Sequence, residues 1–312
     1  MLPTLEQIQS ARSTIAGTAI RTPLVRFNED GPAEIYLKLE NLQPIGAFKI
    51  RGAANAIARI PREELSKGVI TASAGNMAQG VAWCARDLGI PCTVISPDTA
   101  PAAKISAVER LGGKVIKAPF EDWWRAFEQR AYPGVEGRFI HAFDDLDVMA
   151  GNGTIGLEII EDLPDVDAVV VPFGGGGLAC GIAAAIKAVK PACRCYAAEV
   201  DTAAPLVRAM EAGKPQTVPY QTSFVDGIGS KTVFPQMLER ALQLLEASLV
   251  TTLDEIASAI RILVQRNRIV AEGAGACGVA AARAGRAGTG KVVCIVSGGN
   301  IDAAKLAAIL TA

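Results

Sequence analysis

Histidine is nearly absent from this chain of 312 residues, which contains only His141. One histidine cannot supply a metal site built from several imidazole rings. Aromatic residues make up only 5% of the sequence, and 31 basic against 32 acidic side chains leave a net charge of −1. Proteins that bind nucleic acid usually carry a strong excess of basic residues, so we expect no nucleic-acid partner.

Long apolar runs are also missing. No run approaches the ~20 residues that a membrane-spanning helix needs. The amino-terminal sequence has neither the basic start nor the apolar stretch of a secretory signal. We therefore expect no membrane partner and a cytoplasmic location.

Seven cysteines are an odd number and stand mostly in apolar surroundings, so we expect reduced, buried thiols. Cys193 and Cys195 are too close in sequence for a zinc knuckle, and no second pair stands at ligand spacing. The sequence therefore predicts no metal site.

Short apolar strands alternate with helices from about residue 68 onward, which is typical of parallel sheets covered by helices. The segments 68–73, 91–96 and 114–118 are predicted strands, and helices 76–88 and 102–111 connect them. These elements predict a compact βαβαβ unit of their own.

The same alternation resumes after a polar stretch at 132–137, with a helix at 153–161, a strand at 168–172 and a helix at 178–189. We therefore predict an α/β fold with two open-sheet lobes, each with parallel strands and flanking helices, and a cleft between them. The segment 205–235 contains several prolines and no clear period, so we predict a loop near the cleft or at an interface.

Lys49 stands among apolar and small residues in segment 46–53. Burial disfavours the charged form of an amine, so a lysine in such surroundings can become a nucleophile that attacks a carbonyl group. The alternative is a surface lysine on a helix, which is the commoner case.

Four consecutive glycines, 174–177, follow the predicted strand 168–172 and precede a helix of small residues. Backbone amides can approach a phosphate closely at such a turn, and the helix N-terminus adds a partial positive charge. The pattern Gly174-x-Gly176-x-x-Ala179 also fits a dinucleotide site, with Glu199 at the end of the next strand as a ribose ligand. A nicotinamide-dependent oxidoreductase is therefore an alternative.

Two further polar turns follow predicted strands. They are Ser73-Ala74-Gly75-Asn76 and Ser297-Gly298-Gly299-Asn300. Ligands of open α/β sheets bind at the carboxyl ends of the strands, so we expect both turns to meet Lys49 and the glycines in one cleft. Either turn alone could be an ordinary helix cap.

Taken together, these segments resemble the fold type II pyridoxal-phosphate enzymes, and within them the threonine and serine dehydratases and serine racemases. The resemblance covers nearly the whole chain. It implies a tryptophan synthase β-like architecture, pyridoxal 5'-phosphate as cofactor, an amino acid as substrate and a homodimer. It also implies a large cofactor-binding domain, 1–60 and 146–312, and a small mobile domain, 61–145. The motifs that carry it lie at 38–53, 72–80, 143–145, 153–158, 174–178 and 297–300.

The resemblance also implies roles for individual residues. Lys49 would hold the cofactor covalently and then act as the base at the substrate Cα, while Phe48 would pack on the cofactor ring. Asn76 would bond the phenolic oxygen, and Ser297 would face the pyridine nitrogen. The phosphate would lie against Gly174, Gly175, Gly176, Gly177 and Leu178, and the substrate carboxylate would lie against Ser73, Ala74, Gly75, Asn76 and Met77.

A neutral hydroxyl at the pyridine nitrogen suits β-elimination, because the leaving hydroxyl removes the charge that develops at Cα. The resemblance therefore predicts dehydration and deamination of L-threonine or L-serine to a 2-oxo acid and ammonia. Ala74 replaces a second serine that serine racemases carry, which makes racemisation the lesser alternative. Met77 replaces a histidine common among relatives, so hydroxyaspartate or phenylserine are alternative substrates. A cofactor-binding sensor without turnover is a third possibility.

Three departures concern other parts of the family pattern. Glu199 and the Ala203 backbone match part of a divalent-metal site, but Pro205 stands where its second carboxylate belongs, so we predict no complete site. The segment 226–231 resembles a glycine-containing loop beside the cofactor, but the residues that follow it match the family pattern less closely. The chain ends 12 residues after Asn300, so we expect no regulatory domain and no feedback control by isoleucine.

Overall fold

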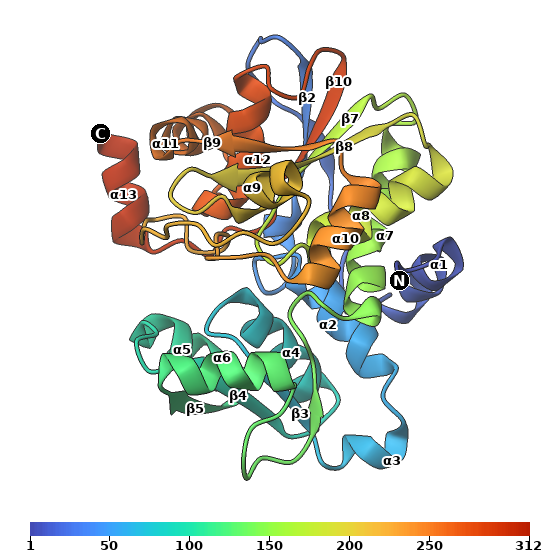
Figure 1. Cartoon of the computed structure of the whole chain (residues 1–312), viewed down its shortest axis with the longest axis vertical. Coiled ribbons are helices and arrows are strands. Elements are labelled where there is room, and N and C mark those ends of the chain that lie inside the picture. The colour runs from blue at the N-terminus through green and yellow to red at the C-terminus, as the bar shows by residue number, and fades with distance from the viewer.

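The computed structural model describes residues 1–312 and contains two β-sheets, one in each of the two lobes seen in Figure 1. The larger sheet has six strands in the order β1-β2-β10-β7-β8-β9, and the smaller has four in the order β5-β4-β3-β6. Every pair is parallel except β1 with β2. The predicted α/β fold with two lobes of parallel strands is confirmed.

The strands of the larger sheet are β1 (Leu24–Arg26), β2 (Glu34–Lys38), β7 (Ala168–Pro172), β8 (Arg194–Val200), β9 (Ala247–Thr251) and β10 (Lys291–Ile295). Those of the smaller sheet are β3 (Val69–Ala72), β4 (Cys92–Pro97), β5 (Lys114–Ala118) and β6 (Arg138–Phe139).

The helices that precede β7 in the chain are α1 (Leu5–Thr14), α2 (Lys49–Ala58), α3 (Arg62–Leu65), α4 (Asn76–Asp87), α5 (Ala102–Arg110), α6 (Phe120–Gln129) and α7 (Leu146–Asp162), with a 3-10 turn at Glu40–Leu42. The later helices are α8 (Gly177–Val189), α9 (Pro205–Ala212), α10 (Pro235–Leu244), α11 (Leu253–Ile262), α12 (Gly273–Arg283) and α13 (Ala303–Thr311), with a π turn at Leu263–Asn267.

Both faces of the larger sheet are buried under helices. Along β7, Val169 and Val171 pack into one apolar core, while Ala168 and Val170 pack into another on the opposite face. Because side chains alternate along a strand, a strand covered on both faces needs an unbroken apolar run, which the sequence of β7 provides.

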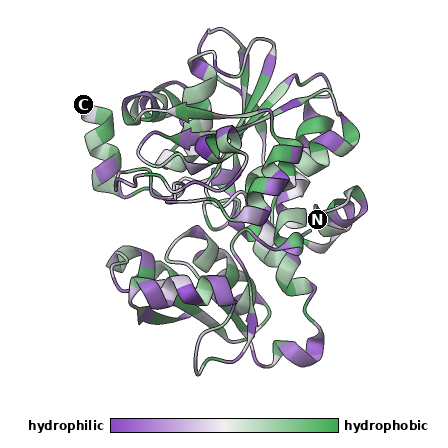
Figure 2. Cartoon of the chain, in the orientation of Figure 1, coloured by the Kyte–Doolittle hydropathy of each residue, from purple (hydrophilic) through white to green (hydrophobic).

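The smaller sheet shares its core with α2, α4 and α6. Figure 2 shows hydrophilic and hydrophobic residues alternating along α6, whose Ala126 and Phe127 are buried. This helix follows Pro119 and was not among the predicted elements. The remaining predicted strands and helices of this lobe form within two residues of their expected bounds.

Helix α2 lies between the lobes, in contact with α4 on one side and α7 on the other. Glycines permit this approach: a Cβ on Gly151 of α7 would come within 2.4 Å of the Arg51 carbonyl oxygen. Helix α7 begins earlier than the predicted residue 153, because the Asp145 carboxylate accepts hydrogen bonds from the amides of Asp147 and Val148.

A cluster of four buried charges fixes α2 to the larger lobe. The Arg51 guanidinium donates to Glu40 at 2.8 and 2.9 Å and to Glu158 at 2.7 and 2.9 Å. The Lys38 amine lies 2.6 Å from Glu158 and donates to the Thr22 carbonyl at 2.6 Å. Two cations thus balance two carboxylates, and every charge has more than one partner.

The prediction of a loop at 205–235 is partly wrong. Residues 205–212 form α9, while 213–234 contain no helix or strand. The helix depends on a distant partner, because the Glu199 carboxylate at the end of β8 accepts hydrogen bonds from the Leu206 and Val207 amides. Gly213 ends the helix in a left-handed conformation, φ 65°.

No helix is both long and apolar enough to span a membrane. All seven cysteines are free and buried. The division of the chain into a domain of residues 1–60 and 146–312 and a mobile domain of 61–145 stays a prediction.

Arg51→Met should lower the free energy of unfolding by about 3–5 kcal/mol, because Glu40 and Glu158 would remain buried without their main cation. Urea denaturation measures this loss. The matched control is Arg12→Met, whose side chain is 46% exposed beside Glu161 and whose loss should cost under about 1 kcal/mol. Equal small losses in both variants would contradict the importance of the buried cluster.

Candidate functional site

The segment before Lys49 runs beside the turn that follows β10. Ala47 and Gly298 form an isolated antiparallel bridge, and the Phe48 amide donates to the Ser297 carbonyl at 3.0 Å. The Gly299 amide donates to the Gly46 carbonyl at 2.9 Å. The structure therefore brings Lys49 and Ser297 together, although 248 positions separate them in sequence.

Lys49 is the first residue of α2, and its side chain lies at the junction of the lobes. The Nζ atom donates to the Ala142 carbonyl oxygen at 2.9 Å and lies 5.0 Å from the centre of the Phe48 ring. Burial lowers the pKa of Lys49 to about 8, and the negative charge of Glu272 opposes this shift. A large fraction of the amine is therefore neutral near pH 8, as a nucleophile requires.

His141 shapes the turn that presents the Ala142 carbonyl. Its Nδ1 accepts hydrogen bonds from the amides of Phe143, at 3.3 Å, and Asp144, at 2.9 Å. Burial lowers the pKa of His141 to about 3, with Arg130 adding to the effect. The ring is thus neutral and holds the backbone, which is a structural role.

The four glycines between β7 and α8 form a tight turn against Phe143. A Cβ on Gly175 would come 1.9 Å from the Phe143 ring, and one on Gly177 would come 2.7 Å from the Phe143 Cα. Gly176 has φ 92°, a conformation that favours glycine. The amides of Gly174, Gly175 and Gly176 donate no hydrogen bond within the protein, so they can bind an anion at the start of α8.

The turn between β3 and α4 offers a second anion site. The Ser73 hydroxyl accepts a hydrogen bond from the Gly75 amide at 3.2 Å, and α4 begins at Asn76 without a side-chain cap. Ala74 contributes only a methyl group. Met77 is 2% exposed, and its side chain packs in the core of the smaller lobe, so this side chain does not reach a ligand at the turn.

Asn76 connects this turn to two residues of the larger lobe. Its Nδ2 donates to Glu272 Oε1 at 2.9 Å, and its Oδ1 accepts from Asn300 Nδ2 at 2.8 Å. Glu272 was not among the residues predicted for the site. The only sequence signal was a carboxylate placed directly before the glycine and alanine residues of α12.

Ser297 lies two residues after the end of β10 and is 3% exposed. Its carbonyl accepts a hydrogen bond from the Phe48 amide. Its side-chain hydroxyl can donate or accept a hydrogen bond, so it can meet a ligand atom at the junction of the lobes.

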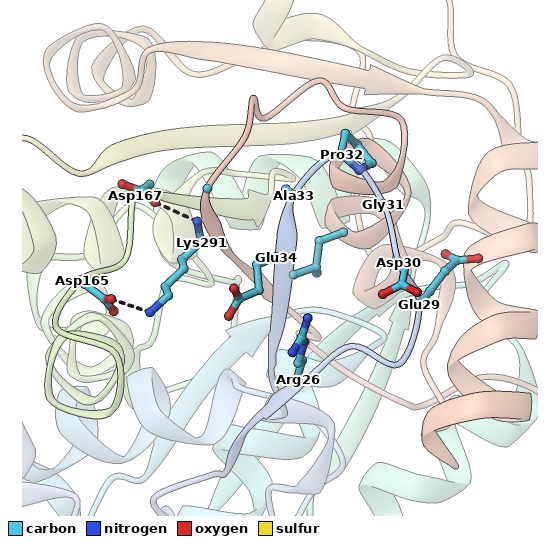
Figure 3. Close-up of a pocket in the computed structure, with 12 residues that line it drawn as sticks. Arg26, Glu29, Asp30, Gly31, Pro32, Ala33, Glu34, Asp165, Asp167 and Lys291 are labelled. Atoms are coloured by element: carbon cyan, nitrogen blue, oxygen red, sulfur yellow. Dashed lines mark hydrogen bonds and ion pairs between the residues drawn. The ribbon is translucent and has the colours of Figure 1, made fainter.

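A separate cavity lies away from these residues. Figure 3 shows it at the amino ends of β2 and β10, where Arg26, Glu34 and Lys291 line it. Its volume is about 660 Å³. Ligands of parallel sheets bind at the opposite, carboxyl ends of the strands, and none of the predicted site residues lines this cavity.

The nicotinamide alternative does not hold. Glu199, which would bind the ribose, accepts hydrogen bonds from the Leu206 and Val207 amides and from the Ser248 hydroxyl, at 2.7–2.9 Å. Both oxygens of its buried carboxylate are therefore used inside the protein.

Comparison with known proteins agrees with this geometry. Residues 15–298 match the family described as pyridoxal-phosphate dependent enzyme. An L-threonine ammonia-lyase from Thermotoga maritima is 42% identical over 96% of this chain and 76% of its own length. A catabolic L-threonine dehydratase from Staphylococcus aureus is 36% identical over 98% of this chain and 91% of its own. The structure of maize serine racemase has a TM-score of 0.92, with 32% identity over 100% of this chain and 98% of that one.

The residues present fit this cofactor. A phosphate can lie at the glycine turn, where the amides of Gly174, Gly175 and Gly176 donate no hydrogen bond to the backbone. The Lys49 amine can meet an aldehyde, and the Ser297 hydroxyl can meet a ring nitrogen. The detailed roles of these residues stay predictions.

Gly175→Ala should destabilise the protein by about 1–3 kcal/mol, because the new methyl group would displace the Phe143 ring. The same displacement should weaken binding of pyridoxal phosphate. Gly174→Ala is the matched control, since its Cβ would meet no atom nearer than 3.5 Å. Thermal unfolding of both variants without cofactor measures the difference, and equal unfolding temperatures would contradict the packing described for Gly175.

Proposed function

The chain belongs to the family of pyridoxal-phosphate dependent enzymes, and from this premise we propose that it is an ammonia-lyase. Its substrates are L-threonine and L-serine, which it converts to a 2-oxo acid and ammonia. Two relatives at 42% and 36% identity carry the names L-threonine ammonia-lyase and L-threonine dehydratase. The observation that carries the proposal is the half-buried Lys49 amine, which lies 2.9 Å from the Ala142 carbonyl oxygen and beside two turns that can bind anions.

Pyridoxal phosphate, when bound, supplies an aldehyde for a primary amine and an electron-withdrawing ring that stabilises negative charge at the substrate Cα. Residues 174–178 would hold its phosphate through their amides, and Phe48 would pack on its ring. Asn76 would donate to its phenolic oxygen, and Ser297 would face its ring nitrogen. Lys49 would be the amine that meets its aldehyde.

With the cofactor bound, the Lys49 amine would act as the base that takes the proton from the substrate Cα. Its lowered pKa of about 8 suits this task, because a base works best when its pKa lies near the working pH. The turn of residues 73–77 binds the substrate carboxylate at the start of α4, where the helix dipole favours an anion.

Loss of the Cα proton and of the β-hydroxyl as water leaves an enamine, which hydrolyses to the 2-oxo acid and ammonia. Racemisation would require a proton donor on the face opposite Lys49. The turn carries Ala74 there in place of a second hydroxyl, so elimination is the favoured outcome. Racemisation remains the lesser alternative, as do other β-hydroxy amino acids as substrates.

Lys49→Ala should abolish formation of 2-oxo acid from L-threonine and L-serine, because both the covalent attachment and the base are lost. The assay measures 2-oxo acid release by the protein loaded with pyridoxal phosphate, over L- and D-β-hydroxy amino acids. Lys67→Ala is the control, since that side chain is 65% exposed near Glu136. Retained elimination by Lys49→Ala would contradict the role of Lys49, and an inactive wild type would contradict the lyase itself.

We also propose a cytoplasmic homodimer. Seven buried, unpaired cysteines are typical of a reducing compartment. Ile20, Leu42 and Val270 expose 46%, 50% and 42% of their surface, and hydrogen bonds from Gln43 to Ile20 and from Asn41 to Val270 bring their segments together. Such an apolar patch suits a subunit interface.

Leu42→Asp should therefore shift the protein from dimer to monomer, because it places a charge within this patch. Sedimentation velocity measures the change, and Leu88→Asp on another 53% exposed leucine is the control. A wild-type monomer would overturn the proposed dimer.

A further inference from the structure

Glu272 is a buried carboxylate at the start of α12 whose presence is costly to the fold. It is 6% exposed, and burial raises its pKa to about 7 from an ordinary 4.5. Near pH 4 the group is mostly protonated in both the folded and the unfolded chain, so it does not lower the free energy of unfolding. As the pH rises towards 7 the unfolded chain ionises first, so the free energy of unfolding falls, and this loss persists above pH 7. Charged groups kept at such a cost are concentrated at functional sites.

The direct side-chain partner of Glu272 is the Asn76 amide. The ionised carboxylate only accepts hydrogen bonds, so in that form the contact at 2.9 Å requires the Asn76 Nδ2, and not its oxygen, to face Glu272. On the other side, Asn300 Nδ2 donates both to Asn76 Oδ1, at 2.8 Å, and to the Ile45 carbonyl, at 2.9 Å. Both ends of the Asn76 amide are therefore fixed, and one Nδ2 hydrogen remains for a ligand.

The backbone around Glu272 leaves room for this carboxylate. A Cβ on Gly298 would come 2.5 Å from Glu272 Oε1, and one on Gly227 would come 3.3 Å from it. The Glu272 amide donates to the Gly298 carbonyl at 3.0 Å. Three segments of the larger lobe thus meet at one side chain.

The contact also crosses between the lobes. Asn76 begins α4 beside the four-stranded sheet, while Glu272 begins α12 beside the six-stranded sheet. The charged groups that influence Glu272 are Lys49, Asp226 and Lys104. The last two form an ion pair at 2.9 Å that likewise joins the lobes.

We propose that Glu272 is a positioning residue that orients the Asn76 amide and directs its remaining Nδ2 hydrogen at the cofactor. It also holds the turn of residues 73–76 against the larger lobe. The inference rests on the proposed function, because the oriented amide acts there on bound pyridoxal phosphate.

A double-mutant cycle tests the proposal with the variants Glu272→Ala, Asn76→Ala and the pair together. The readouts are the dissociation constant of pyridoxal phosphate, followed by visible absorbance, and kcat/KM for L-threonine. Each single variant should weaken cofactor binding about tenfold, the effect of one charge-assisted hydrogen bond. The pair should be no weaker than Asn76→Ala alone, because Glu272 acts through Asn76.

Glu272→Gln separates positioning from proton transfer. Glutamine keeps an acceptor oxygen for Asn76 but cannot exchange a proton, so this variant should remain within about threefold of the wild type in both readouts. Glu211→Ala, which removes a 58% exposed carboxylate, is the control and should change neither. Two outcomes would overturn the proposal. One is a double variant whose loss of cofactor affinity equals the product of the two single losses, and the other is a Glu272→Gln variant as impaired as Glu272→Ala.

Hydrogen exchange of the cofactor-free protein keeps the test independent of the proposed reaction. Glu272→Ala should increase amide exchange in residues 73–80 about tenfold, because the turn loses its contact with the larger lobe. Glu211→Ala should leave this exchange unchanged. Unaltered exchange in Glu272→Ala would refute the positioning role, whereas inactivity of the wild type alone would refute only the lyase.

Discussion

The buried cluster of Arg51, Glu40, Glu158 and Lys38 is the interaction on which the site depends. Helix α2 packs its apolar side chains into the core of the smaller lobe, while Arg51 reaches two carboxylates of the larger lobe. Lys49 stands two residues earlier on the same helix. Because buried charges tolerate little displacement, the cluster fixes the position at which the Lys49 amine enters the junction of the lobes.

Glycine determines how closely the elements around the site can approach. Gly151 allows α2 to touch α7, and Gly175 and Gly177 allow the glycine turn to pack against Phe143. The same Phe143 belongs to the turn that His141 shapes and that presents the Ala142 carbonyl to Lys49. The anion site and the lysine site are therefore built on one short segment of backbone.

Burial has opposite consequences for the two charged groups nearest the reaction. It lowers the pKa of Lys49 and raises the pKa of Glu272, so each group is about half protonated at neutral or slightly alkaline pH. For Lys49 this yields a neutral nucleophile. For Glu272 it means a stability cost, which the proposed orientation of Asn76 would explain.

The sequence by itself determined the α/β class, the parallel strands and the segments that meet at the junction, because apolar periodicity and glycine turns are local signals. It also identified Lys49, the four glycines and the two polar turns. Only the tertiary structure revealed the role of Glu272, whose partner Asn76 lies 196 positions away. It also revealed helix α9, whose first amides donate to Glu199 of strand β8. Only the structure showed that the Met77 side chain lies in the core of the smaller lobe. Such features depend on long-range contacts and desolvation, which no local pattern encodes.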